Sequence, residues 1–115
     1  MSKTYSIVGM EHRKMEGFVS TLPVGADVTL VREPNNPFDP CAIAVWINGN
    51  HVGYIPKKQN VALANQIDQI GSTSLAMDAL PPGLKVRKTE KAIPAKFVRS
   101  PNSGYPQVAV EDASE

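Results

Sequence analysis

The sequence lacks several features that define broad classes of protein. Its longest apolar stretches, near residues 42–47 and 61–64, fall far short of the roughly 20 residues with which a helix crosses a bilayer. Residues 1–5 carry no apolar run typical of a secretory signal, and the single cysteine, Cys41, has no second cysteine for an internal disulfide. We therefore expect a protein of the reducing cytoplasm that has no membrane partner.

An excess of one charge is also missing. The 12 Lys and Arg residues and the 11 Asp and Glu residues leave a formal net charge of +1, so bulk charge does not predict tight, non-specific binding to duplex DNA. The charges are nevertheless uneven along the chain. An acidic tail at residues 111–115 follows a run of basic residues, which are Lys85, Arg87, Lys88, Lys91, Lys96 and Arg99. Any nucleic-acid site is therefore expected to be local.

The residues that catalysis and metal binding require are scarce or scattered. The two histidines, His12 and His51, and Cys41 do not follow a zinc-ligand spacing. The sequence has no glycine-rich phosphate loop followed by Lys-Ser or Lys-Thr, and it lacks the clustered carboxylates of two-metal enzymes. We predict that the protein is not an enzyme and that it holds no metal ion or cofactor.

The residues that are present suit one small domain. With 115 residues, of which 42% are hydrophobic, the chain is long enough for one modest core, which we assign to residues 1–110. The pair Asn48-Gly49 between two β-branched runs is the strongest hairpin signal. Strands are predicted at residues 5–9, 24–32, 41–46 and 51–55, and residues 17–19 are expected to resume extended structure.

The second half of the chain begins with one clear helix. Val61, Leu63, Ala64 and Ile67 recur at three- and four-residue spacing, which predicts an amphipathic helix over residues 57–70. This face is expected to be buried.

The remaining segments predict further short strands and, with the rest, a fold class. Residues 108–110 either form a last strand or lie loose, and Pro94 indicates that its own strand lies at an edge of the sheet. The predicted strands are residues 75–77, 84–87 and 93–99. These elements favour a β-rich α+β fold, a small modified OB-like β-barrel with one or two helices.

The loop before the first hairpin carries the strongest functional signal. Residues 34–37 read Pro-Asn-Asn-Pro; each proline fixes its own φ angle and each asparagine can bond to its own backbone, so the loop is predicted to be rigid. Phe38 follows without the alternating apolar neighbours of a buried strand. Such a loop can hold this ring and the carboxylate of Asp39 in fixed directions.

This loop and the hairpin after it closely resemble the HIRAN domain family. The matching runs are Arg-Glu-Pro-Asn-Asn-Pro-Phe-Asp at residues 32–39, Ala-Ile-x-Val at residues 42–45 and Gly-Asn-His-Val-Gly-Tyr-Ile-Pro at residues 49–56. The resemblance covers residues 7–70, and its central motif is long and ordered. The family occurs at the N-terminus of Snf-type helicases that remodel stalled replication forks, and as small stand-alone proteins of bacteria and phages, which this chain resembles.

The resemblance implies a modified OB-type barrel that captures the 3′ end of single-stranded DNA in a narrow pocket. It implies that the ring of Phe38 stacks on a base and that the carboxylate of Asp39 accepts a hydrogen bond from the terminal 3′-hydroxyl. Both roles suit the side chains, because every base has a π-face and because a carboxylate repels a terminal phosphate but accepts a bond from a hydroxyl. Asp39 would therefore detect the end of the strand.

Further site residues follow from the same resemblance. Lys57 and Lys58 fall where the family contacts phosphate, at the start of the predicted helix, where free backbone N–H groups also favour an anion. Tyr54 falls where family members have a histidine or tyrosine that faces the DNA. His12 and Arg13 fall near a family aromatic that this chain lacks. The candidate DNA-binding residues are therefore Arg32, Asn36, Phe38, Asp39, Tyr54, Lys57, Lys58, His12 and Arg13.

Several candidates also have a purely structural interpretation. Arg32 at a strand end favours a hydrogen-bond donor that fixes the loop, with DNA contact second. Asp39 equally predicts an Asx-turn residue, and Phe38 without the resemblance would be a loop anchor packed on the barrel. Lys57 and Lys58 by themselves indicate only a helix start.

Two functional hypotheses follow. The first is a binding module for a free 3′ end of single-stranded DNA, accessory to DNA repair or replication, with a helicase or another repair protein as its partner. The second is a protein-interaction adaptor that uses an exposed edge of the barrel, for instance the strand at residues 93–98, and binds no DNA. The intact loop favours the first hypothesis, and the absence of an aromatic residue between Gly9 and Gly17 favours the second.

Overall fold

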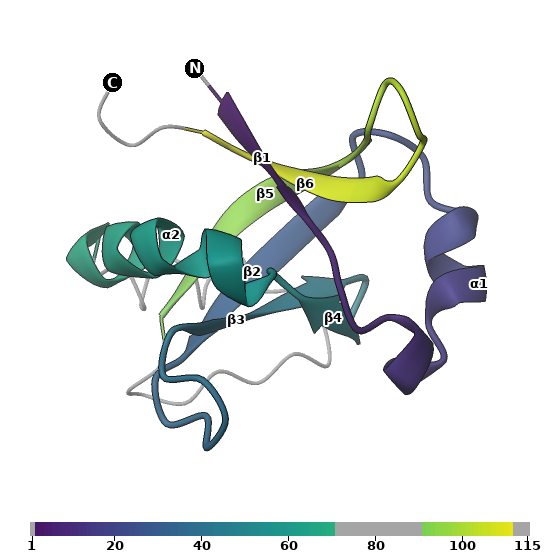
Figure 1. The fold of residues 1–115 in the computed structure, drawn as a ribbon. Helices are drawn as coiled ribbons and strands as arrows, with labels where there is room; N and C mark the ends of the chain where they lie inside the picture. Colours follow the sequence, from purple (N-terminus) through teal and green to yellow (C-terminus); the bar gives the residue numbers. More distant parts are fainter. Residues whose placement is uncertain (1, 71–90, 112–115) are drawn as a thin grey trace.

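Six strands form one antiparallel sheet within residues 2–70 and 91–111, which the computed structural model describes (Figure 1). The strand order in the sheet is β1-β6-β5-β2-β3-β4. The elements in chain order are β1 (Ser2–Ser6), the 3-10 helix η1 (Glu11–Arg13), α1 (Glu16–Ser20), β2 (Asp27–Glu33), β3 (Ala42–Ile47), β4 (Asn50–Tyr54), α2 (Lys57–Ile70), β5 (Ala92–Arg99) and β6 (Pro106–Glu111). The predicted β-rich α+β class is confirmed.

The sheet curls until its two edge strands, β1 and β4, nearly meet. Val8, two residues beyond the end of β1, bridges Tyr54 of β4: the Val8 N–H donates to the Tyr54 carbonyl at 2.8 Å, and the Tyr54 N–H donates to the Val8 carbonyl at 2.9 Å. Gly53 permits this approach, because a Cβ at its position would lie 2.4 Å from the Val8 carbonyl oxygen. This seam between residues 8 and 54 gives the sheet the shape of a half-barrel with an inner and an outer face.

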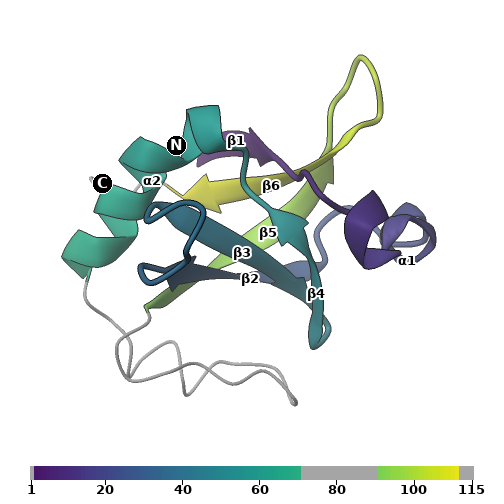
Figure 2. The same ribbon diagram turned by 60° about the horizontal axis from the view of Figure 1, so that its bottom comes forward.

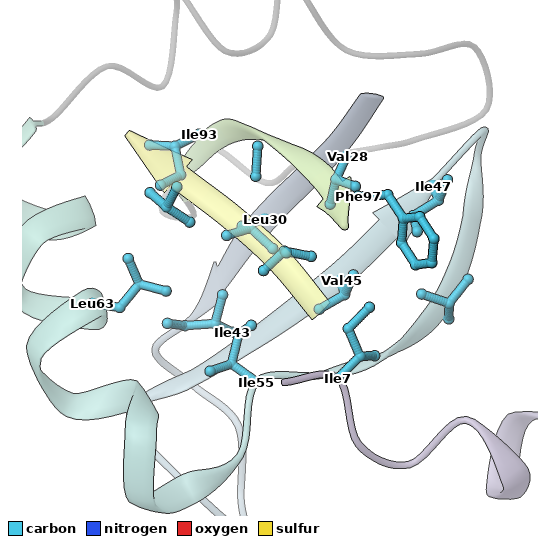
Figure 3. Packing of buried hydrophobic residues seen from close by; sticks show 14 of the residues in the cluster. Ile7, Val28, Leu30, Ile43, Val45, Ile47, Ile55, Leu63, Ile93 and Phe97 are labelled. Carbon is cyan, nitrogen blue, oxygen red and sulfur yellow. The ribbon is translucent and has the colours of Figure 1, made fainter. Parts of the chain in front are cut away.

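The inner face of the half-barrel carries the hydrophobic core (Figure 3). Strand side chains alternate between the two faces of a sheet, so every second residue of β2 and β3 enters the core. The ring of Phe97 on β5 is fully buried among them. The inward residues of β2 and β3 are Val28, Leu30, Ile43, Val45 and Ile47, each at most 2% exposed.

Helix α2 covers one end of the half-barrel, and α1 lies at the opposite end (Figures 1 and 2). The predicted helix over residues 57–70 is confirmed, and Leu63, Ala64 and Ile67 are fully buried. The prediction for Val61 is wrong, since its side chain is 55% exposed. Asn60 is buried in its place at 1% exposure, because it lies three, four and seven residues before the buried apolar positions.

Two predictions for the first quarter of the chain are corrected. Residues 17–19 are helical, not extended: the Val19 N–H donates to the Met15 carbonyl at 2.9 Å, and the turn of α1 directs Val19 into the core. The first strand spans Ser2–Ser6 instead of residues 5–9 because it pairs with β6, with Ser2 opposite Glu111 and Ser6 opposite Gln107.

The strand that contains Pro94 is not an edge strand. β5 pairs with β2 on one side and with β6 on the other. On the side of β5 that faces β2, the Phe97 N–H donates to the Ala26 carbonyl, and the Phe97 carbonyl accepts from the Gly25 N–H. The direction of the backbone groups alternates along a strand, so the nitrogen of Pro94 faces the side of β6. The pairing of β5 with β6 runs from Lys96 to Arg99, so Pro94 lies outside it. The missing donor of Pro94 therefore breaks no rung of the sheet, and the strand that served as the example of an exposed edge for an adaptor lies inside the sheet.

The central hairpin has the turn that the sequence predicts. Asn48 and Gly49 both have positive φ angles, 52° and 79°, as a two-residue turn between twisted strands requires. Residues 108–110 belong to β6, and Glu111 of the expected acidic tail is its last residue. The strands predicted at residues 75–77 and 84–87 lie outside the described residues. In the described part of the chain, no helix has the length and apolar character to span a membrane.

Candidate nucleic-acid interface

The loop between β2 and β3 is held by the side chain of Asn36. Its Oδ1 accepts hydrogen bonds from the backbone N–H groups of Phe38 at 2.9 Å and Asp39 at 3.1 Å, and its Nδ2 donates to Oε1 of Glu33 at 3.0 Å. The backbone N–H of Asn36 also donates to the Glu33 carbonyl at 3.1 Å. The prediction that an asparagine of this loop bonds to the loop's own backbone is confirmed. Asn36 thereby helps to fix the directions in which the side chains of Phe38 and Asp39 point.

Phe38 points into solvent. Its side chain is 89% exposed, the largest value among the exposed large hydrophobic residues of the described chain. The hydrophobic effect opposes such exposure, and the loop offers the ring no apolar partner in the core. The outward orientation predicted for Phe38 is confirmed, and its packing as a loop anchor is excluded.

Asp39 is held by two hydrogen bonds, one to each carboxylate oxygen. Oδ1 accepts from the backbone N–H of Cys41 at 2.9 Å, which is the predicted Asx-turn, and Oδ2 accepts from Nδ2 of Asn60 on α2 at 2.8 Å. The bond from Asn60, then that from Cys41, and then the charges of Lys57 and Arg32 lower the pKa of Asp39 below its ordinary value of 3.8, although partial burial opposes them. Asp39 is therefore a carboxylate at neutral pH.

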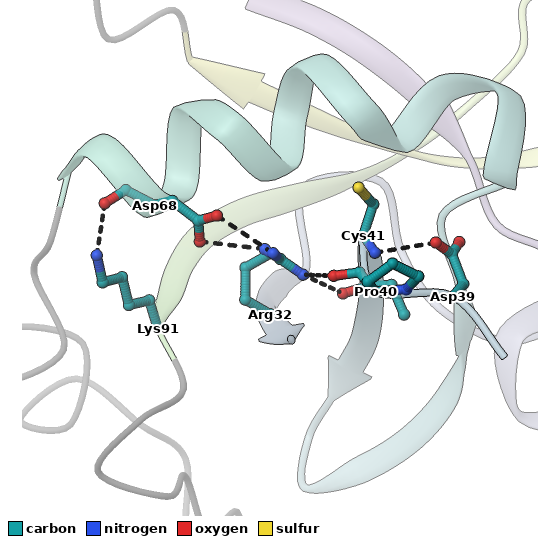
Figure 4. Close-up of polar contacts among 7 residues, drawn as sticks. Arg32, Asp39, Pro40, Cys41, Asp68 and Lys91 are labelled. Atoms are coloured by element: carbon teal, nitrogen blue, oxygen red, sulfur yellow. Dashed lines mark hydrogen bonds and ion pairs between the residues drawn. The ribbon is translucent and has the colours of Figure 1, made fainter. Parts of the chain in front are cut away.

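Arg32 supports this loop from inside the protein (Figure 4). Its side chain is nearly buried, and its Nε and Nη2 donate to the two carboxylate oxygens of Asp68 at 3.1 Å and 3.2 Å. Its Nη1 donates to the carbonyl oxygens of Pro40 at 2.9 Å and Ala42 at 3.3 Å. All three guanidinium nitrogens bond to protein groups, so the geometry fits the loop-fixing interpretation of Arg32 and leaves no donor nitrogen unengaged for DNA.

Tyr54 joins the loop to an aromatic row on β3 and β4. Its hydroxyl donates to Oε1 of Glu33 at 3.0 Å, and burial, with this hydrogen bond and the Glu33 charge, raises the pKa of Tyr54 to about 12. The Tyr54 ring meets the ring of His51 edge-on at 4.9 Å, and His51 stacks on Trp46 at 5.0 Å. Tyr54 is therefore a neutral, well-fixed ring beside the loop.

A cavity of about 480 Å³ brings five of the predicted residues together. Its lining comprises Asn36, Phe38, Asp39, Tyr54 and Lys57, with Val8, Ala42 and Ile55. The cavity thus combines an exposed ring, an ionised carboxylate and an exposed ammonium at the start of a helix. It can bind an aromatic group, a hydrogen-bond donor and an anion side by side.

Four predicted residues do not line this cavity. Arg32 lies behind the loop, and Lys58 is exposed beside Lys57 in the first turn of α2. Arg13 donates from its Nε to the His51 carbonyl at 2.9 Å, and His12 is exposed on η1. The cavity receives no residue from η1, which matches the missing family aromatic in that segment.

The described members of the basic run near the C-terminal end are engaged within the protein. Lys91 donates to the Asp68 carbonyl, Lys96 pairs with Asp27, and Arg99 donates to three carbonyls at the end of α1. Lys85, Arg87 and Lys88 lie outside the described residues. None of the three described residues lines the cavity.

Sequence reasoning missed two residues of the site. Glu33 accepts from both Asn36 and Tyr54, and its only signal is its place in the motif before Pro34. Asn60 bonds to Asp39, and its signal is a polar residue at a position that the helical period assigns to the apolar face. No cluster of three or more metal-ligating side chains occurs within the described ranges.

Most of the chain matches one known family. The HIRAN domain matches residues 2–89. This chain belongs to the HIRAN domain family. The predicted membership is thereby confirmed.

Related proteins extend this comparison. A protein from Lactobacillus plantarum superimposes on this HIRAN domain with a TM-score of 0.63 and 23% identity, over 95% of this chain and 92% of its own. The HIRAN domain of human HLTF does so with a TM-score of 0.55 and 24% identity, over 96% and 77%. These two likenesses concern the fold.

A curated relative matches a shorter segment. The helicase-like transcription factor of Oryctolagus cuniculus is 55% identical over 42 residues, or 36% of this chain. The match spans 4% of that protein's length.

Proposed function

We propose that this HIRAN domain binds single-stranded DNA at a free 3′ end, with the terminal base on Phe38 and the terminal hydroxyl on Asp39. The observation that carries the proposal is the ring of Phe38, which is 89% exposed at a cavity that it shares with Asp39 and Lys57. A ring held in water by a rigid loop contributes nothing to the core. Base stacking on such a ring is worth about 1–3 kcal/mol and explains its orientation.

The charges in the cavity support recognition of an end. The Asp39 carboxylate is ionised and would repel a terminal phosphate, whereas a 3′-hydroxyl can donate a hydrogen bond to it. Lys57 in the same cavity and Lys58 beside it can bind the phosphates that precede the terminal nucleotide. A strand is thus favoured when its phosphates lie toward the helix and its hydroxyl lies at the carboxylate.

The cellular role follows from this specificity. We propose that the domain is an accessory to DNA repair or replication and that a helicase or another repair protein is its partner. The relative from Oryctolagus cuniculus is named a helicase-like transcription factor, and 42 residues of this chain match it. A module that marks 3′ ends would direct such a partner to the ends of strands.

Oligonucleotides that differ only at the 3′ end test the binding proposal. We expect a 5′-labelled single strand of about ten nucleotides, within the site size of small single-strand-binding folds, to bind more tightly with a 3′-hydroxyl than with a 3′-phosphate. The expected difference is about tenfold, as for the loss of a hydrogen bond to a charged group. The affinity should also fall with salt, with a logarithmic slope of about −0.7 for each phosphate neutralised.

Phe38→Ala is the variant for this test. It should weaken binding about 5- to 150-fold, equivalent to the stacking energy of one base, and leave Tm unchanged because the ring is exposed. Val24→Ala, which truncates another exposed apolar side chain in the turn before β2, is the matched control and should bind as the wild type does. Equal affinities for the two 3′ ends, or full binding by Phe38→Ala, would refute the proposal.

A further inference from the structure

The side chain of Asn60 contacts the site from helix α2, outside the sequence runs that indicated the site. Asn60 lies in the first turn of α2, is 1% exposed, and donates from Nδ2 to Oδ2 of Asp39 at 2.8 Å. It is the only buried polar residue besides Arg32 in the described chain. Its bond joins the helix to the loop that carries Phe38.

The orientation of this amide is fixed by chemistry. The Asp39 carboxylate is ionised and can only accept hydrogen bonds, so the NH₂ group of Asn60 has to face it. The carbonyl oxygen of the amide then points away, and it is a buried oxygen without a hydrogen-bond partner in the described structure.

Stability alone does not account for an amide at this position. A buried acceptor without a partner opposes folding, and an apolar side chain of similar size in contact with the core would avoid that cost. Leu63, Ala64 and Ile67 on the same face of α2 are apolar and fully buried. We therefore infer that the amide of Asn60 serves the carboxylate of Asp39, to which it donates.

The bond from Asn60 decides how much of Asp39 remains for a ligand. A carboxylate offers about four acceptor positions, of which Cys41 N–H and Asn60 Nδ2 occupy one on each oxygen. With both oxygens held, the carboxylate cannot rotate, and its remaining lone pairs keep one direction at the cavity that Asp39 lines.

We propose that Asn60 is a positioning residue for end recognition: through its amide it fixes the ionised Asp39 carboxylate in the orientation that accepts the 3′-hydroxyl. This inference rests on the proposed function and deepens it, because it assigns the specificity for a hydroxyl end to a helix residue that does not line the cavity.

The first test uses the free protein. The pKa of Asp39, followed by NMR of its side-chain carboxyl carbon, should rise in Asn60→Leu because the bond that lowers it most is lost. Asn65→Leu makes the same chemical change at an exposed position of α2 and should leave this pKa unchanged. The Tm of Asn60→Leu should stay close to that of the wild type, since the variant loses the bond to Asp39 but no longer buries an unpartnered oxygen.

The second test measures binding. Asn60→Leu should reduce the preference for a 3′-hydroxyl over a 3′-phosphate about fivefold, as for the loss of one hydrogen bond. The acid limb of its pH–affinity profile should also move to higher pH. In an Asp39→Asn background the same substitution should have no further effect on the preference, because the carboxylate that Asn60 orients is absent.

A second substitution gives a signature that a structural role would not produce. In Asn60→Asp the introduced carboxyl group can donate to Asp39 only while the pair holds a proton, so the preference for a 3′-hydroxyl should become pH-dependent: it should be present while the pair holds one proton and be lost as the pH rises and that proton leaves. This result would support the inference even if Asn60→Leu did not fold.

The outcomes separate the inference from the function on which it rests. A wild-type protein that prefers a 3′-hydroxyl, with Asn60→Leu unchanged in Asp39 pKa and in preference, overturns the inference and leaves the proposed function intact. A wild-type protein that does not distinguish the two ends overturns both.

Discussion

Glu33 is the residue through which the loop and the aromatic row are joined. One oxygen, Oε1, accepts from Nδ2 of Asn36 and from the hydroxyl of Tyr54, both at 3.0 Å. Glu33 therefore fixes two cavity-lining residues from one position at the end of β2. The carboxylate of Glu33 also keeps the neighbouring hydroxyl of Tyr54 protonated, so Tyr54 contributes a neutral side chain to the cavity lining.

Tyr54 should titrate late in alkaline solution. Its pKa is raised from 10.0 to about 12, so the folded state holds this proton more tightly than the unfolded state does. The resulting stability is present below pH 10.0 and is lost as the pH rises toward 12. The ultraviolet absorbance of tyrosinate should show a phase near pH 12 that disappears in Tyr54→Phe.

Glu33→Gln provides the control for the cause. Burial contributes most to the raised pKa of Tyr54, and Glu33 contributes next through its hydrogen bond and its charge. The variant should therefore move the late phase to lower pH without abolishing the shift. A late phase that stays in place in Glu33→Gln would assign the whole shift to burial.

At the scale of elements, α2 is the support of the binding loop. One polar side chain of the helix contacts the loop directly and one acts through a strand residue: Asn60 bonds to Asp39, and Asp68 binds Arg32 of β2, whose Nη1 bonds to Pro40 and Ala42. The helix thus holds the end of the loop that leads into β3. The ion pair of Asp68 with Arg32 is drawn in Figure 4, and Leu63 on the apolar face of the helix packs on the core (Figure 3). A change at Asn60 or Asp68 is therefore expected to affect the cavity although neither residue lines it.

Asp68→Ala should loosen the loop. It leaves the buried guanidinium of Arg32 with only its two carbonyl partners, and we expect a loss of about 1–3 kcal/mol in the free energy of unfolding. Since Asp68 is 45% exposed, solvent screens part of the pair and keeps the loss below that of a fully buried one. Denaturant unfolding measures the change.

Asn65→Ala, at an exposed position of the same helix, is the control for Asp68→Ala. It should change the free energy of unfolding by less than about 0.5 kcal/mol. Equal stabilities of Asp68→Ala and Asn65→Ala would show that the ion pair contributes nothing to the loop.

At the scale of the whole molecule, one seam turns a sheet into a half-barrel. The Val8–Tyr54 bridge brings the end of β1 against β4, and both residues line the cavity. The cavity therefore lies at the point where the sheet closes. The seam requires glycine at position 53, because the approach of Val8 leaves no space for a side chain there.

Gly53→Ala should open the seam. The added Cβ would meet the Val8 carbonyl oxygen at 2.4 Å and Ile7 Cγ2 at 3.0 Å, and backbone atoms cannot move aside as a flexible side chain can. We expect a loss of about 1–3 kcal/mol in the free energy of unfolding, as for overpacking. Hydrogen exchange at the Val8 and Tyr54 amides should accelerate.

Gly17→Ala is the matched control for the seam. No atom lies within 4 Å of a Cβ at Gly17, which is inside α1, so alanine should stabilise the protein by about 0.5–1 kcal/mol. A Gly53→Ala protein as stable as the wild type would show that the seam tolerates a side chain.

The local patterns of the sequence determined the central hairpin, helix α2 and the loop that carries the site. Asn48-Gly49 specifies its turn by backbone conformation, the repeat of Leu63, Ala64 and Ile67 specifies its helix, and Asn36 specifies the loop through bonds to residues two and three positions away. All of these interactions act within a few residues, so the sequence alone predicts them.

Only the tertiary structure decided which residues complete the site. The bond of Asn60 to Asp39, the ion pair of Arg32 with Asp68 and the bridge of Val8 to Tyr54 join residues 21, 36 and 46 positions apart. The position of β5 inside the sheet likewise depends on partners distant in the chain. Such contacts arise from the packing of whole elements, which no local pattern records.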